Sequence, residues 1–137
     1  MQAFALIRPH TLAAARQRVL AQPEARLLRA GGVDLLDRMK EGLETPSELV
    51  ELTSLQGELG QQLRALKPDA GGWQLGALVT LSQLAEHSDL GGGFAALRQA
   101  AGSAATPGIR NLATLGGNLL QRPRCWYFRS ADLSCLK

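Results

Sequence analysis

Two consecutive strand-and-helix patterns at the start of the chain constrain its fold more than any other feature. The apolar run Ala3–Arg8 is typical of a short buried strand, and Leu12–Ala21 follows it with apolar residues at helical spacing. Arg26–Arg29 predicts a second strand, which leads through two glycines into a helix whose apolar face begins at Leu35. The alternating run Glu48–Thr53 predicts a third strand. Because parallel neighbours need a crossover helix, the pattern predicts a small parallel βαβ sheet.

The second half of the chain repeats neither unit. The polar stretch Gly57–Gly72 predicts a boundary or a weak hairpin between subdomains. The elements predicted after it are a strand at Trp73–Val79, helices at Leu81–His87 and Phe94–Ala101, and a glycine turn within Thr106–Leu120. We therefore expect two subdomains, residues 1–56 and residues 57–137.

Composition places the chain among globular proteins, since 45% of its 137 residues are hydrophobic and 20% are charged. A chain of this length has the size of one domain with a sizeable core. No segment approaches the roughly 18 uninterrupted apolar residues that a membrane span needs, and no long apolar stretch follows a basic start. We therefore expect no membrane association and a cytoplasmic location.

Basic residues gather near the end of the sequence. Residues 110–137 contain five basic side chains and Asp132 as their one acid. Such a tail suits nucleic acid, an anionic ligand, an acidic partner or a solvated surface. Tyr127 and Phe128 could stack bases, but one short aromatic loop is a thin platform. Core packing of Trp126–Phe128 is therefore favoured, and no nucleic-acid partner is expected.

The turn Ala30–Asp34 (AGGVD) is the first candidate binding site. Its two glycines allow positive φ and close approach to a ligand, and the helix that follows presents free amides at its positive end. The turn is not a GxGxxG motif, and it lacks the lysine and hydroxyl residue of a P-loop. Alone, it is more often simply a turn, with Asp34 as a helix cap rather than a ligand.

A second glycine turn, Gly116–Asn118, follows Thr114 much later in the chain. Its hydroxyl and carboxamide groups suit phosphate or ribose oxygens, although a tight loop is again the commoner meaning of such a turn. Two glycine turns can hold one pyrophosphate between them. The pair therefore favours a dinucleotide over either turn taken alone.

Cys125 and Cys135 are the two cysteines of the chain, and three arginines lie close to them in sequence: Arg122, Arg124 and Arg129. Positive neighbours lower the pKa of a thiol and favour the thiolate that binds iron or zinc. Two thiolates without a CxxC pair do not complete a zinc site, so any metal or cluster here needs further ligands. No acid, base or nucleophile signature stands out elsewhere, so no catalytic residue is expected.

Three separated segments of the chain carry a family likeness: Leu27–Lys40 (LLRAGGVDLLDRMK), Leu75–His87 (LGALVTLSQLAEH) and Gly108–Arg129 (GIRNLATLGGNLLQRPRCWYFR). Together they resemble the FAD-binding medium subunit of the xanthine dehydrogenase and molybdenum hydroxylase family. The resemblance runs from Met1 to Lys137, and it is closest to the branch with an extra four-iron four-sulfur cluster, as in aldehyde oxidoreductases. It implies an α+β fold, the FAD-binding domain of the vanillyl-alcohol-oxidase (PCMH) type. In that fold a small βαβ subdomain precedes an α/β subdomain, here incomplete.

The resemblance also implies which residues hold cofactors. The first glycine turn would contact the FAD pyrophosphate from one side, and the second glycine turn, with Thr114, from the other. The implied FAD contacts are Leu28, Arg29, Ala30, Gly31, Gly32, Val33, Asp34, Leu35, Thr114, Gly116, Gly117 and Asn118. Cys125 and Cys135 would be the first two ligands of the 4Fe-4S cluster. Val33 stands where the family usually has Thr or Ser, which removes a hydroxyl from the first loop but leaves its amides.

By the same resemblance the chain is the N-terminal portion of an electron-transfer subunit of an oxidoreductase. In the family, electrons from aldehydes, purines or related substrates oxidised at molybdopterin pass through iron–sulfur clusters to FAD, and then to an acceptor. The implied partners are a 2Fe-2S small subunit and a molybdopterin large subunit, and export with a partner would make the location periplasmic. The competing interpretation is a non-catalytic remnant or interaction module without a bound cofactor.

Overall fold

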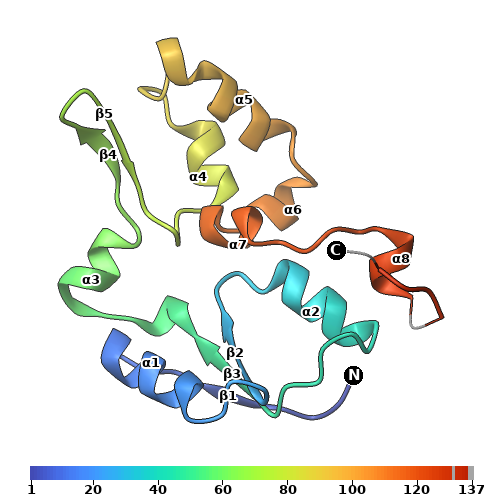
Figure 1. Cartoon of the computed structure of the whole chain (residues 1–137). Helices are drawn as coiled ribbons and strands as arrows, with labels where there is room; N and C mark the ends of the chain where they lie inside the picture. The colour runs from blue at the N-terminus through green and yellow to red at the C-terminus, as the bar shows by residue number, and fades with distance from the viewer. Residues whose placement is uncertain (131, 136–137) are drawn as a thin grey trace.

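The computed structural model describes residues 1–130 and 132–135 (Figure 1). The first half comprises β1 (Ala5–Ile7), α1 (Leu12–Leu20), β2 (Arg26–Arg29), α2 (Val33–Lys40), β3 (Glu48–Glu51) and the 3-10 turn η1 (Leu52–Ser54). The second half comprises α3 (Gly57–Gln62), β4 (Leu66–Asp69), β5 (Gly72–Leu75), α4 (Leu81–Glu86), η2 (Gly92–Phe94), α5 (Ala95–Ser103), α6 (Pro107–Arg110), α7 (Leu115–Leu119) and α8 (Trp126–Arg129). Among these helices, none in the described residues is long and apolar enough to cross a membrane.

The first half forms the three-stranded parallel sheet that the sequence predicts. β3 lies between β1 and β2, and both pairings are parallel. Leu49 and Val50, adjacent on the central strand, are both fully buried, so both faces of the sheet are covered. Val50 packs with Ala15 of α1, whereas Leu49 packs with Leu35 and Met39 of α2. The two crossover helices therefore cover opposite faces.

Ion pairs fasten the outer strands and helix α1 to the two ends of β3. Glu48 pairs with Arg18 and Arg26, and Glu51 pairs with Arg8 and Arg29. The hydrogen bond from Arg18 holds the pKa of Glu48 below its ordinary value. Burial alone would raise the pKa of Glu51, but hydrogen bonds and the arginine charges outweigh it and the pKa is lowered.

The second half contains a β-hairpin followed by a small helical cluster. β4 and β5 pair antiparallel, with Leu66 opposite Leu75. Val79, Leu84 and Leu90 are fully buried and lie at the centre of a core that joins the hairpin to α4 and α5. This core is separate from the two that cover the faces of the parallel sheet.

The stretch Gly57–Gly72 is more ordered than the sequence predicts, because it contains helix α3 and strand β4. The strand expected at residues 73–79 also ends early, at Leu75. Gly76 provides the reason: its amide donates to the Ala65 carbonyl oxygen at 2.7 Å, and a Cβ there would lie 2.3 Å from the Leu63 carbonyl oxygen. The chain therefore turns at Gly76 and packs against the end of α3.

The glycine turn expected within Thr106–Leu120 is instead a pair of short helices, α6 and α7. Thr114 caps α7, since its hydroxyl accepts the Gly117 amide at 3.2 Å. Gly116 lies inside α7, where a Cβ would come 3.0 Å from Ala77. Gly116 and Gly117 therefore belong to the first turn of a helix. Glycine disfavours helical structure, so the contact with Ala77 imposes it here.

Candidate functional site

The loop between β2 and α2 offers a row of backbone amides without partners. Gly32 adopts a φ of 78° and takes the cap position, so that α2 begins at Val33. The first helical hydrogen bond runs from the Leu36 amide to the Gly32 carbonyl oxygen at 2.9 Å. No side chain caps α2, and the amides of residues 31–35 donate to no other described residue. Amides grouped at the positive end of a helix are the arrangement that binds anions.

Gly31 brings this loop against the second half of the chain. A Cβ at Gly31 would lie 1.8 Å from the Leu112 carbonyl oxygen and 3.4 Å from the Ala113 Cα. This approach requires glycine, since any side chain would collide with backbone. In Figure 1, α7 lies beside the start of α2. The structure therefore places the Ala30–Asp34 turn against the Leu112–Ala113 backbone, just before the helix α7 that contains the second pair of glycines.

The first turn of α7 differs from that of α2 because the chain already uses its amides. The Gly117 amide donates to the Thr114 hydroxyl, and the Leu115–Gly116 amides donate to carbonyl oxygens of residues 77–79 at 2.8 and 2.9 Å. The Asn118 carboxamide is half-buried and makes no hydrogen bond with another described residue. Around α7, a ligand would therefore find one side-chain group, the Asn118 carboxamide. At the loop between β2 and α2 it would find several backbone donors.

Asp34 lies in the first turn of α2 and is not the helix cap that the sequence favours. A carboxylate is stabilised there by the helix dipole. It accepts hydrogen bonds from Arg38 Nε at 3.0 Å and from the Arg122 amide at 3.3 Å. Arg129 pairs with the same carboxylate at 3.4 Å. Asp34 therefore joins α2 to the cysteine-bearing end of the chain.

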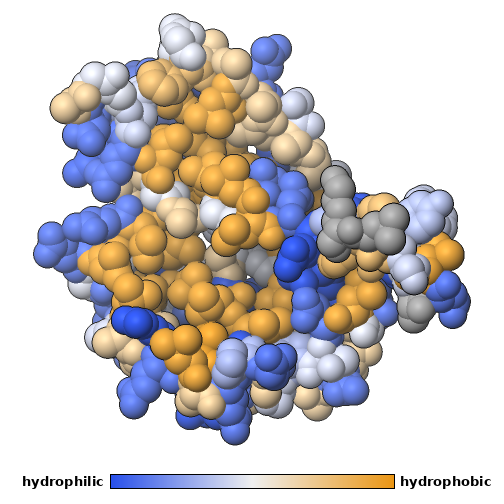
Figure 2. Space-filling view, viewed as in Figure 1, coloured by the Kyte–Doolittle hydropathy of each residue, from blue (hydrophilic) through white to orange (hydrophobic). Residues whose placement is uncertain are grey.

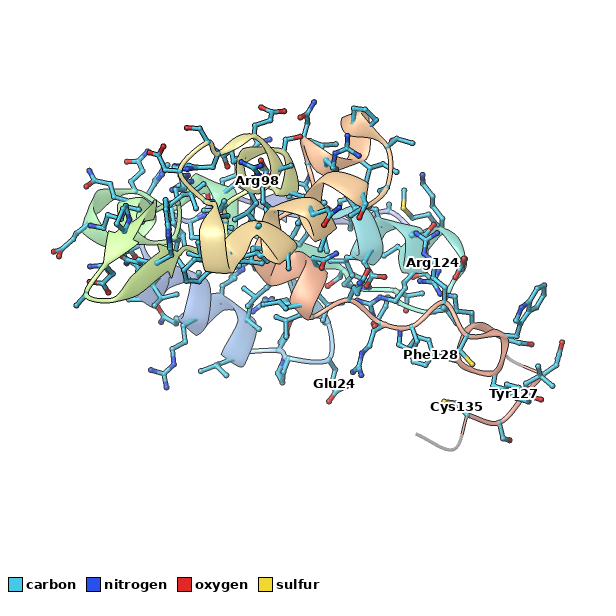
Figure 3. All side chains as sticks on the ribbon, turned by 90° about the horizontal axis from the view of Figure 1, so that it is seen from above. Glu24, Arg98, Arg124, Tyr127, Phe128 and Cys135 are labelled. Atoms are coloured by element: carbon cyan, nitrogen blue, oxygen red, sulfur yellow. The ribbon has the colours of Figure 1, made fainter. Side chains whose placement is uncertain are left out.

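Cys125 and Cys135 are both exposed. Figure 3 shows Cys135 and Tyr127 at the edge of the molecule, away from the packed body. Arg124 and Arg129 pair with carboxylates of α2, so the electropositive surroundings expected for the thiols are largely neutralised. Within the described part of the chain, no three histidine, cysteine or acidic side chains gather to hold a metal ion.

The aromatic loop does not pack into the core, contrary to expectation. Trp126 and Tyr127 are 86% and 60% exposed, and Phe128 is half-buried. Helix α8 is a single turn, and its Arg129 pairs with Asp37 of α2. Of its three aromatic side chains, only Phe128 is half-buried among the described residues.

Apolar side chains are exposed around the two glycine segments. They are Leu28, Leu112, Leu119 and Leu120, which are between 49% and 82% exposed. Figure 2 shows apolar surface across the middle of the molecule, where its two halves meet. A bound ligand with a flat apolar ring would find both amide donors and apolar contacts here.

Two hollows elsewhere on the surface do not include the glycine segments. One, of about 560 Å³, lies between α4 and α5 and is lined by small residues, by Gln99 and by Arg98, which Figure 3 labels. The other, of about 320 Å³, lies beside α1. The candidate site is therefore an open surface at the junction of the halves, and not one of these hollows.

Sequence reasoning missed the roles of Asp37 and Glu41. Together with Asp34 they lie on one face of α2 at spacings of three and four residues. This acidic stripe was the available signal, because the basic tail is its natural complement.

Comparison with known proteins identifies the class of domain. A family model described as the FAD-binding domain in molybdopterin dehydrogenase matches residues 2–133. The chain belongs to this family. It is 39% identical over 137 residues to the aldehyde oxidoreductase FAD-binding subunit PaoB of Escherichia coli K12, a match that covers all of this chain and 41% of that protein. It is 36% identical over 112 residues to the xanthine dehydrogenase FAD-binding subunit of Escherichia coli O157:H7, 82% of this chain and 37% of that one.

Solved structures agree with this assignment. Quinoline 2-oxidoreductase from Pseudomonas putida 86 aligns with a TM-score of 0.76 and 28% identity, over 86% of this chain and 39% of that chain. CO dehydrogenase from Oligotropha carboxidovorans aligns with a TM-score of 0.76 and 28% identity, over 85% and 39%. These relatives are subunits of oxidoreductases, and the chain spans about two-fifths of their length. The family resemblance and the α+β FAD-binding fold are confirmed.

Proposed function

We propose that the chain holds the pyrophosphate of FAD on the amides of the loop between β2 and α2. The observation that carries this proposal is the row of amides at residues 31–35, which donate to no other residue that the structure describes. Several N–H groups at a helix N-terminus suit two linked phosphates, because they donate hydrogen bonds at the positive end of the helix dipole. Val33 lacks a hydroxyl, but its amide remains available, so the substitution leaves this mode of binding intact.

The second segment forms the other wall of the proposed site. Its amides serve α7, so Thr114, Gly116 and Gly117 shape the wall and the Asn118 carboxamide supplies the hydrogen bond. The proposed FAD contacts are Leu28, Arg29, Ala30, Gly31, Gly32, Val33, Asp34, Leu35, Thr114, Gly116, Gly117 and Asn118. In this proposal residues 1–56 and 57–137 are the two subdomains between which the cofactor lies.

The proposed role is electron transfer within a molybdenum-containing hydroxylase or dehydrogenase. FAD supplies the electron and hydride chemistry when it is bound, while the chain binds and orients it. The name of the PaoB relative favours an aldehyde as the substrate of the whole assembly. A 2Fe-2S subunit and a molybdopterin subunit are the partners that we propose, by likeness to the family.

We further propose that Cys125 and Cys135 supply two ligands of a 4Fe-4S cluster. Both thiols are exposed, so ligands from outside the described residues can reach an iron atom bound there. Arg124 and Arg129 are engaged elsewhere, which leaves thiolate charge to be balanced by the iron itself.

The test is to purify the chain together with any subunits that accompany it, denature it, and identify the released flavin and iron. One FAD per chain is expected. Cys125→Ser should lower the iron content and leave FAD unchanged. Absence of flavin would overturn the FAD proposal. An iron content that Cys125→Ser leaves unchanged would overturn the assignment of the cysteines as cluster ligands, but not the FAD proposal.

A further inference from the structure

Arg129 makes more ionic contacts than any other described side chain of the cysteine-bearing segment, residues 121–130. One terminal nitrogen donates to Asp37 Oδ2 at 2.9 Å and to both Glu41 carboxylate oxygens at 2.8 and 3.0 Å. The other terminal nitrogen lies 3.4 Å from Asp34 Oδ1. Its Nε donates to the Pro123 carbonyl oxygen at 3.2 Å, within the segment. One guanidinium therefore joins Asp34 and Asp37 of α2, and Glu41 at its C-terminal cap, to the backbone of the segment.

The surroundings of Arg129 distinguish it from an ordinary surface ion pair. Its side chain is 10% exposed, whereas that of Arg124, which pairs with Asp37 at 3.1 Å, is 72% exposed. Burial by itself lowers the pKa of Arg129, but Asp37 and Glu41 outweigh it and the pKa is raised. A buried, multiply bonded guanidinium holds its geometry far better than an exposed pair does.

The rest of the segment has few attachments to the body. It belongs to neither sheet, and its one-turn helix α8 is closed by the Arg129 amide donating to the Cys125 carbonyl oxygen at 3.0 Å. Its hydrogen bonds and ion pairs to α2 end on the same acidic stripe, including the Arg122 amide on Asp34. The position of Cys125 relative to α2 therefore depends on this stripe, and Arg129 occupies its centre.

We propose that Arg129 is a positioning residue, which holds the cysteine-bearing segment against α2 and so fixes Cys125 relative to the glycine loop at the start of that helix. Asp34 connects the segment to the glycine loop, because it lies in the first turn of α2 and also accepts a hydrogen bond from the Arg122 amide of the segment. The proposal rests on the proposed function only in taking the glycine loop as the flavin site. The attachment itself involves no cofactor.

Hydrogen–deuterium exchange of the full chain, read by mass spectrometry, tests the attachment directly. Arg129→Gln removes the charge, Arg129→Met keeps most of the side-chain bulk, and Arg129→Lys keeps the charge. Arg124→Gln is the matched control, because that exposed arginine makes a single ion pair in the same segment. We expect exchange in residues 121–130 to accelerate about tenfold in the Gln and Met variants, with most protection restored by Lys. Peptides from α4 and α5 should be unchanged, and so should the Arg124 variant.

Unchanged exchange in Arg129→Gln would overturn the proposal, and so would protection by Met equal to that by Lys, which would show a packing role. If Arg129→Gln accelerates exchange everywhere, Glu41→Gln decides, because this carboxylate is 41% exposed and its loss leaves the core intact. In Glu41→Gln, a smaller acceleration confined to residues 121–130 supports the proposal. If exchange in residues 121–130 of that variant is unchanged, the proposal is overturned. Failure of the proposed function would be seen in a different measurement, as the absence of released flavin when the purified protein is denatured.

Discussion

At the scale of single residues, Gly31 decides whether the two halves of the chain can meet. The Leu112 carbonyl oxygen occupies the space of its missing Cβ, 1.8 Å away. Gly32 acts differently, because its φ of 78° turns the chain from β2 into α2. One glycine therefore sets a contact between segments and the other sets the direction of a helix.

We predict that Gly31→Ala destabilises the chain by about 1–3 kcal/mol, because backbone must move to admit the methyl group. It should also weaken FAD binding, since the same movement displaces the amides of residues 31–35. Gly108→Ala is the control, because nothing lies within 4 Å of a Cβ there. Thermal unfolding and flavin titration check both effects. Equal stability of the two variants would contradict the assigned contact.

The lowered pKa of Glu51 predicts how the stability of the folded chain depends on pH. Its pKa is lowered in the folded chain, so its contribution is present above the unfolded pKa and is lost as pH falls through the lower, folded value. The melting temperature should therefore fall as pH is lowered below the ordinary glutamate pKa of about 4.3. Glu51→Gln should flatten that fall. Glu24→Gln should not, because Glu24 is exposed at the periphery (Figure 3). Parallel acid curves for wild type and Glu51→Gln would contradict the role of the ion pairs.

At the scale of elements, α7 depends on its cap more than on its own sequence. Two of its five residues are glycines, which are poor helix formers. We predict that Thr114→Ala costs about 1 kcal/mol, as other lost caps do, and that Thr114→Ser costs less. Urea unfolding measures both. Equal losses for alanine and serine would show that the threonine methyl, and not the cap, stabilises this region.

Sequence patterns predicted the βαβ unit well and the second half less well, for a physical reason. Helix α2 and the central strand β3 have local apolar patterns that match their burial, and the AGG turn is marked by its own residues. β1, which the sequence predicts as a buried strand, lies instead at the edge of the sheet, where Ala5 and Leu6 are exposed. The end of β5 and helix α7 are decided by contacts at Gly76 and Ala77 with distant backbone. Such contacts leave no periodic signal.

The same distinction applies to the candidate site. Both glycine turns are visible in the sequence, and the structure packs Gly31 of the first against Leu112, which lies shortly before the second. What the sequence does not show is that α7 has used its amides and that the acids of α2 hold the basic tail. The acidic stripe and the basic tail are each visible in the sequence, but which of their groups pair, and which amides of α7 are already used, depends on the fold.

At the scale of the whole molecule, two bodies of structure meet at one open surface. The parallel sheet with α1 and α2 lies on one side, and the hairpin β4–β5 with α4, α5, α6 and α7 lies on the other (Figure 1). Apolar side chains are exposed where they meet, beside backbone amides of residues 31–35 that donate to no other described residue. The arrangement suits a cofactor held between two parts, and the attachment at Arg129 brings the cysteines to the same side as α2.

The most direct test of this account is to titrate the isotope-labelled chain with FAD and follow its backbone amides by NMR. We predict that the amides of residues 31–35 shift most, that the Asn118 side chain shifts with them, and that the internally bonded amides of Leu115–Gly117 shift much less. ADP should reproduce the shifts at residues 31–35, because it carries the pyrophosphate. Shifts confined to the hollow between α4 and α5, or no saturable shift at all, would contradict the assignment of the β2–α2 loop as the pyrophosphate site.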